Sequence, residues 1–125
     1  MMSLDVSIDG NLSVEAMLEQ FHLEEGGEAQ KALTLATMYY MLPYWAYDTG
    51  RLANSAYDAS NYATGEIVYD TPYAQEMYYG VREDGRPVNY HHDKNPQAGP
   101  FPLERMLADH MDDIIEEVGK VARDQ

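Results

Sequence analysis

The chain has 125 residues, and its 8 lysines and arginines against 22 aspartates and glutamates give a formal net charge of −14. This charge argues against a surface that binds nucleic acid or anionic membranes, because such surfaces need clustered lysine and arginine. Cysteine is absent, which excludes disulfides, thiolate metal sites and thiol nucleophiles. We expect one soluble domain spanning 1–125, since no signal-peptide pattern and no apolar run of roughly 18 residues is found.

The first third of the sequence predicts a short arm followed by helices. Residues 1–12 hold an alternating pattern at 4–8 that is typical of a strand. Two helices are expected within 13–42, the first beginning after the N-cap residue Ser13 and the second running from about 28 to 41 before Pro43 ends it. The apolar face of the second helix is predicted to contain Ala32, Leu35, Ala36, Tyr39 and Leu42.

The segment 48–80 is predicted to be a central β element. Its strands are expected at 51–60 and 65–70, paired around a turn at 61–64, with Ile67 and Tyr69 on one face of the second strand. A short helix is expected over 73–79, although a third strand is the alternative. Glycines at 50 and 80 suit chain reversals, because glycine adopts backbone angles that other residues resist.

Residues 80–102 predict a long loop and residues 103–122 a long helix. The loop contains Gly85, Pro87, Pro96, Gly99, Pro100 and Pro102 and has little apolar periodicity. The helix carries apolar residues at the i, i+3, i+4, i+7 spacing, with acids largely on the other face. We therefore predict an α+β fold, with N-terminal helices and a long C-terminal helix packed on a small antiparallel β-sheet.

Few residues suggest chemistry. The one grouping with metal-ligand character comprises His91, His92, Asp93, His110 and Asp113. His110 and Asp113 are one helical turn apart, but adjacent loop histidines point apart, and known helical metal signatures need a fuller ligand set. A metal-dependent hydrolase is thus a third hypothesis, and we predict no enzyme, catalytic residue, metal or cofactor.

The aromatic residues are more informative than the histidines. All 11 tyrosines lie between residues 39 and 90, together with the only tryptophan. Aromatic residues with a polar tip are enriched at protein interfaces, although any one of them can equally belong to the core. The predicted interface candidates are Tyr44, Trp45, Thr49, Leu52, Tyr73, Tyr78, Tyr79 and Tyr90.

The order and spacing of several short motifs also resemble a known family. These motifs are Pro43-Tyr44, Asp48-Thr49-Gly50 with Leu52 and Ser55, Gly65-x-Ile67, Thr71-Pro72-Tyr73-Ala74, Tyr78-Tyr79-Gly80 and Glu104-Arg105-Met106 with Ala108-Asp109-His110. Together they resemble the minor capsid or head–tail connector (neck, tail-completion) proteins of tailed bacteriophages. The chain departs from the family pattern at Ala46, where a proline is usual, and at 101–103, where a Trp-Phe pair is usual.

The resemblance implies a structural virion protein, made in the bacterial cytoplasm and located at the junction of head and tail. The implied assembly is a ring of 6 or 12 copies that contacts portal, neck or tail proteins and meets genomic DNA only in transit. An acidic lumen would repel that DNA. The alternative function is a small acidic binding module or inhibitor that acts on a basic protein partner.

Overall fold

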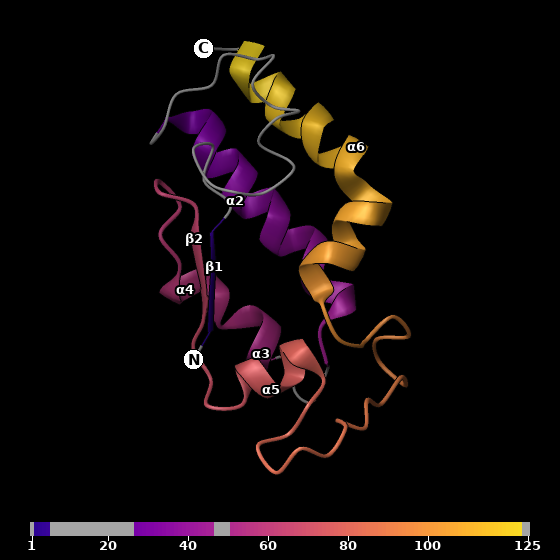
Figure 1. Ribbon diagram of the computed structural model, residues 1–125. Helices are drawn as coiled ribbons and strands as arrows, with labels where there is room; N and C mark the ends of the chain where they lie inside the picture. The colour runs from indigo at the N-terminus through magenta and orange to yellow at the C-terminus, as the bar shows by residue number, and fades with distance from the viewer. Residues whose placement is uncertain (1, 6–26, 47–50, 124–125) are drawn as a thin grey trace.

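The computed structural model describes residues 2–5, 27–46 and 51–123, which form an α+β arrangement (Figure 1). The elements are β1 (Met2–Asp5), α2 (Glu28–Met41), the 3-10 turn η2 (Leu42–Tyr44), α3 (Arg51–Asn54), α4 (Ala56–Ala59), β2 (Glu66–Tyr69), α5 (Ala74–Tyr79) and α6 (Pro102–Arg123). The helix predicted from Ser13, the end of the strand predicted at 4–8, and the turn predicted at Gly50 lie outside the described residues.

Helices α2 and α6 lie side by side and form the main packing unit (Figure 1). The apolar spacing predicted for α6 is confirmed, because Met106, Ile114 and Val118 are each fully buried. Pro102 is the first residue of α6, a position where the missing N–H of proline costs no helical hydrogen bond. The α-helix α2 ends at Met41, ahead of Pro43 as predicted.

The predicted apolar face of α2 was wrong at Leu35 and Tyr39, although Ala36 is buried as predicted. Leu35 and Tyr39 are 48% and 60% exposed, whereas the polar residues Gln30, Thr34 and Thr37 are buried. Thr34 is satisfied there, because its hydroxyl contacts the carbonyl oxygens of Gln30 and Tyr62 at 3.0 Å each. A helix that packs against more than one element buries more than one face, so its apolar periodicity no longer identifies the exposed side.

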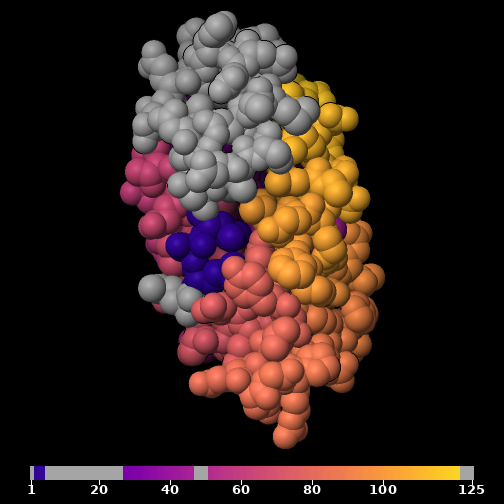
Figure 2. All heavy atoms as spheres, viewed as in Figure 1, coloured from indigo at the N-terminus to yellow at the C-terminus, as the bar shows by residue number. Residues whose placement is uncertain are grey.

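The sheet is a two-stranded antiparallel pair of β1 and β2, with Met2 opposite Tyr69 and Leu4 opposite Ile67. The predicted alternation in β2 is confirmed, since Ile67 and Tyr69 are buried and Glu66 is exposed. In Figure 2 the surface of β1 borders α6 and the residues after β2.

The hairpin predicted between 51–60 and 65–70 was wrong, because 51–54 and 56–59 form the helices α3 and α4. This segment contains Ala53, Ala56 and Ala59, and alanine favours helices and is depleted in strands. Its serines still contact β2: Ser60 Oγ accepts the Val68 N–H at 2.9 Å, and Ser55 Oγ accepts the Asp70 N–H at 3.0 Å. These hydroxyls satisfy two donors along the β2 edge that a third strand would otherwise use.

Three tyrosine hydroxyls fix α6 to the rest of the chain by donating to its carboxylates. The pairs are Tyr40 to Glu117 at 2.7 Å, Tyr44 to Asp109 at 2.5 Å, and Tyr78 to Glu104 at 2.6 Å.

The same contacts hold these tyrosines in their neutral form. The hydrogen bond to Glu117 raises the pKa of Tyr40 to about 12, and burial together with the hydrogen bond to Asp109 raises the pKa of Tyr44 to about 12. Burial, followed by the hydrogen bond to Glu104, raises the pKa of Tyr78. Three of the acids on α6 are therefore structural partners, which the acid-face pattern did not indicate.

The segment between α5 and α6 is fixed to the core near its end. Arg105 donates to the carbonyl oxygens of Pro100 at 2.6 Å, Gln97 at 2.8 Å and Tyr44 at 3.1 Å. Asn95 Nδ2 donates to the carbonyl oxygens of Leu42 and Trp45 at 3.2 and 3.1 Å. The predicted long loop over 80–102 is confirmed as lacking helix and strand up to residue 101, but it has specific contacts within the chain.

Candidate interaction surface

Large apolar side chains remain exposed in two places within the described part of the chain. On α2 they are Leu35 and Tyr39, while at the junction of α5, the loop and α6 they are Tyr79, Val81 and Phe101, which are 49%, 51% and 42% exposed. The rings of Tyr79 and Phe101 meet edge to face with centroids 6.0 Å apart. We call Tyr79, Val81 and Phe101 the aromatic patch.

The backbone positions the aromatic patch through a strained residue. Phe101 has a φ of 53°, a left-handed conformation that is rare for a bulky side chain. Its N–H donates to the Tyr78 carbonyl at 2.8 Å, and its own carbonyl accepts the Arg105 N–H at 3.1 Å. These two hydrogen bonds hold the ring of Phe101 beside Tyr79, at a site where both the exposure and the strain are unfavourable for the isolated chain.

Carboxylates border the aromatic patch. A groove of about 500 Å³ beside it is lined by Pro72, Gln75, Glu76, Tyr79, Val81 and Glu83. Glu76 Oε1 accepts the Glu83 N–H at 3.3 Å, which fixes the start of the loop at this rim. The surface is thus apolar at its centre and acidic at its edge, a combination that fits a protein partner.

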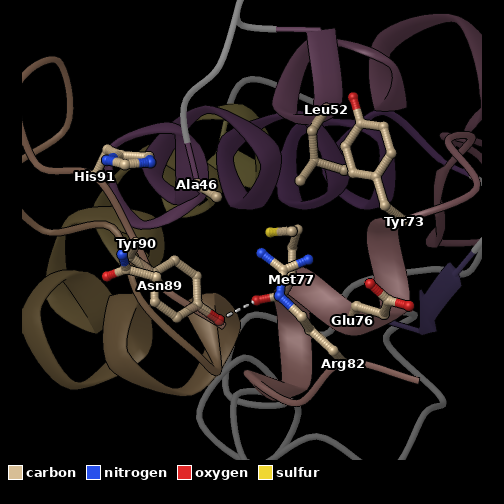
Figure 3. A pocket seen from close by; sticks show the side chains of 9 residues that line it. All are labelled: Ala46, Leu52, Tyr73, Glu76, Met77, Arg82, Asn89, Tyr90 and His91. Carbon is tan, nitrogen blue, oxygen red and sulfur yellow. Dashed lines mark hydrogen bonds between the residues drawn. The ribbon is translucent and has the colours of Figure 1, made fainter. Parts of the chain in front are cut away.

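A second concave site, which we call the α5 cleft, shares Glu76 with that groove. Its volume is about 440 Å³, and its lining residues are Ala46, Leu52, Tyr73, Glu76, Met77, Arg82, Asn89, Tyr90 and His91 (Figure 3). The Tyr90 hydroxyl donates to the Met77 carbonyl at 2.6 Å and so fixes one wall against α5. Burial raises the pKa of the Tyr90 hydroxyl.

The predicted interface residues separate into three groups. Tyr44, Trp45 and Tyr78 are at most 2% exposed and belong to the core, so they cannot lie on a free surface of the single chain. Leu52 is also a core residue at 4% exposed, although it lines the α5 cleft together with Tyr73 and Tyr90, and Tyr79 belongs to the aromatic patch. Thr49 lies outside the described residues.

Sequence reasoning missed Val81, Arg82 and Phe101. The first two follow Gly80 in a segment without periodicity, and Phe101 precedes the first turn of α6 without belonging to its apolar face. One signal was present, because a residue before proline is disfavoured in the helical region. That signal marks a boundary and gives no indication of exposure.

The histidines do not converge. His92 Nε2 lies 3.0 Å from the Ala98 carbonyl oxygen, whereas His110 Nδ1 lies 2.8 Å from Asp113 Oδ2 and its ring stacks on Tyr40. The predicted proximity of His110 and Asp113 is therefore confirmed. Among the residues that the structure describes, no three histidine, aspartate or glutamate side chains are grouped as a metal site would require.

Comparison of the chain with protein-family models, with curated protein sequences and with solved structures found no match. Across the described residues, no helix combines the length and apolar character needed to cross a membrane.

Proposed function

We propose that this protein is a structural virion component of a tailed bacteriophage, a minor capsid or neck protein that joins head to tail. The observation that carries the proposal is the aromatic patch, in which Tyr79, Val81 and Phe101 are exposed together and Phe101 is strained. Burying such a patch against a partner removes apolar surface from water, and this gain in binding free energy can offset the strain at Phe101. Tyrosine and phenylalanine are also enriched at the centres of protein interfaces.

The positions of the resembling motifs support the same proposal. Two of these motifs meet beside the aromatic patch, where the Tyr78 hydroxyl donates to the Glu104 carboxylate at 2.6 Å. Arg105 of the same motif donates to the Tyr44 carbonyl of the Pro43-Tyr44 motif, and its guanidinium lies 5.3 Å from the centre of the Tyr44 ring. Motifs that are up to about sixty residues apart in the sequence therefore build one region of the molecule.

In this proposal the protein assembles as a ring of 6 or 12 copies between portal and tail, after synthesis in the bacterial cytoplasm. Portal, neck or tail proteins are its partners, and genomic DNA passes through the ring without binding to a specific site on the protein. The exposed acid Asp112 on α6 is a candidate for the channel wall, because negative charge repels DNA. Asp109 is a weaker candidate, since its carboxylate accepts the Tyr44 hydroxyl.

The first test is removal of the gene from the phage, followed by negative-stain electron microscopy of lysates. Separate filled heads and free tails are expected, and the neck material that is retained on the heads or on the tails would identify the side that the protein completes. Normal infectious particles would overturn the proposal.

A second test addresses the aromatic patch itself. Phe101→Gly removes the ring and relieves the left-handed strain, so we expect the monomer to stay folded while complementation of the deleted gene falls at least tenfold. Tyr39→Ser is the matched control, because it alters the most exposed of the large apolar residues at a site away from the patch. Equal complementation by both variants would remove the patch from the assembly.

The acidic border of the patch favours one second candidate function, a binding module for a basic protein. Glu76 and Glu83 would then pair with lysine or arginine of that partner. Recovery of one stoichiometric basic protein from host lysate, lost in Phe101→Gly, together with normal virions from the deletion, would select this function over the neck protein.

A further inference from the structure

We propose that the α5 cleft binds an extended peptide segment of a partner protein that carries a glutamate or aspartate beside an apolar side chain. The cleft lies next to α5 but does not include the aromatic patch. The inference therefore stands independently of the proposed function.

The basic group in the cleft is Arg82. Figure 3 shows its guanidinium reaching toward the middle of the cleft, with Leu52 and Tyr73 on one side and Asn89, Tyr90 and His91 on the other. The Arg82 backbone is fixed by a tight turn, because its N–H donates to the Arg86 carbonyl at 2.7 Å and its carbonyl accepts the Gly85 N–H at 2.9 Å. The guanidinium is thus carried by a defined backbone.

Four of the other basic side chains in the described chain have partners. Lys31, Arg86 and Lys120 each form an ion pair with an acid, and Arg105 binds carbonyl oxygens. Within the described ranges 2–5, 27–46 and 51–123, the Arg82 guanidinium makes no ion pair. Arg82 is exposed, lines a concave site and makes no ion pair among the described residues, so its guanidinium can bind a carboxylate supplied from outside.

The acid that lines the cleft, Glu76, forms no ion pair with Arg82. Glu76 uses one carboxylate oxygen to accept the Glu83 N–H, and Figure 3 shows its carboxylate turned away from the Arg82 guanidinium. Among the described lining residues no other carboxylate is present. Within the described lining, the Arg82 guanidinium is the charged group that faces the middle of the cleft.

The remaining walls indicate a peptide as the source of that carboxylate. Leu52, Met77 and Tyr73 provide an apolar wall for a neighbouring side chain. The side-chain amide of Asn89 can donate to a backbone carbonyl and accept a backbone N–H, which matches the peptide group. A carboxylate, an apolar side chain and a peptide group together describe a short acidic segment.

The test is an NMR titration of the full chain, labelled with ¹⁵N, using two blocked tripeptides. Acetyl-Leu-Glu-Leu-amide is expected to shift the amide signals of Leu52, Met77 and Asn89 in a saturable way. Acetyl-Leu-Gln-Leu-amide, which lacks only the charge, is expected to bind at least about tenfold more weakly, because a hydrogen bond to a charged group is lost.

Two variants locate the effect. Arg82→Gln should weaken the glutamate peptide to the level of the glutamine peptide, whereas Arg86→Gln, in the same turn but already paired with Asp84, should leave the affinity unchanged. Equal affinity for the two peptides, no saturable shift, or unchanged binding to Arg82→Gln would each overturn the inference. None of these outcomes bears on ring assembly, which is tested separately with Phe101→Gly.

Discussion

The α2–α6 pair and the segment between α5 and α6 are held by different interactions. The helix pair is held by apolar side chains that recur along α6, such as Met106, Ile114 and Val118. The segment is held by Arg105 and Asn95, whose side chains donate to five backbone carbonyls.

This difference decides how each region responds to change. Apolar packing is spread over many contacts, so one truncation leaves a cavity and weakens the whole fold. Five of the hydrogen bonds of the segment depend on the side chains of Arg105 and Asn95, so truncating one of these side chains releases a local part of the chain.

The largest effect is expected from truncating the helix pair. Ile114→Ala should lower the free energy of unfolding by about 2–5 kcal/mol, because Ile114 is fully buried. Urea denaturation measures it, with Ile115→Ala, at a partly buried position of the same helix, as the matched control with a smaller cost. Equal costs at the two positions would mean that the burial pattern of α6 is incorrect.

The next effect is expected from releasing the segment. Arg105→Gln removes donors to Pro100, Gln97 and Tyr44 and should cost about 1.5–3 kcal/mol, since hydrogen bonds to charged groups are the stronger ones. Limited proteolysis should show new cleavage between residues 94 and 101. Arg86→Gln, whose side chain is 81% exposed, should change stability by less than about 0.5 kcal/mol and leave proteolysis unchanged.

A pair of glycine variants tests how tightly the start of the segment packs against Pro100 and Tyr90. Gly80 has a φ of 76°, and an added Cβ would lie 3.1 Å from Pro100 Cβ and 3.3 Å from the Tyr90 hydroxyl. Gly80→Ala should therefore cost about 1–2 kcal/mol from backbone strain, together with this crowding. Gly85→Ala has a similar φ of 89° but meets nothing within 4 Å, so it measures the strain alone. A Gly80→Ala cost no greater than that of Gly85→Ala would show that the Pro100 contact is unimportant.

The smallest effect is expected at the tyrosine that lies between the two regions. Tyr44→Phe removes the hydrogen bond to Asp109 and should cost about 1 kcal/mol at pH 7. Urea midpoints measured for the wild type and for Tyr39→Phe, an exposed control, provide the comparison.

Tyr44→Phe also tests how the free energy of unfolding depends on pH in the alkaline range. The pKa of Tyr44 is raised from 10.0 to about 12, so its folded state favours the neutral hydroxyl. The stabilisation from this group is complete below pH 10 and is lost as the pH rises from 10 through about 12. Tyr44→Phe should lose less stability over that interval than the wild type, and parallel curves would contradict the assigned cause.

The sequence by itself determined the elements whose signals are local. The apolar spacing of α6, the limit of α2 before Pro43, and the turn at Gly80 all depend on residues close to one another in the chain. The alternation of Ile67 and Tyr69 likewise predicted which face of β2 is buried. These features also determined the α+β class.

Only the tertiary structure decided which residues are covered by distant parts of the chain. It paired β2 with β1 instead of 51–60, and it buried Thr34 and exposed Leu35. It also placed Arg82 in a cleft. Three features depend on groups far away in the sequence. They are which face of α2 is buried, which strand pairs with β2, and which groups surround Arg82. Local periodicity carries no information about them, because one short pattern is compatible with several packing partners.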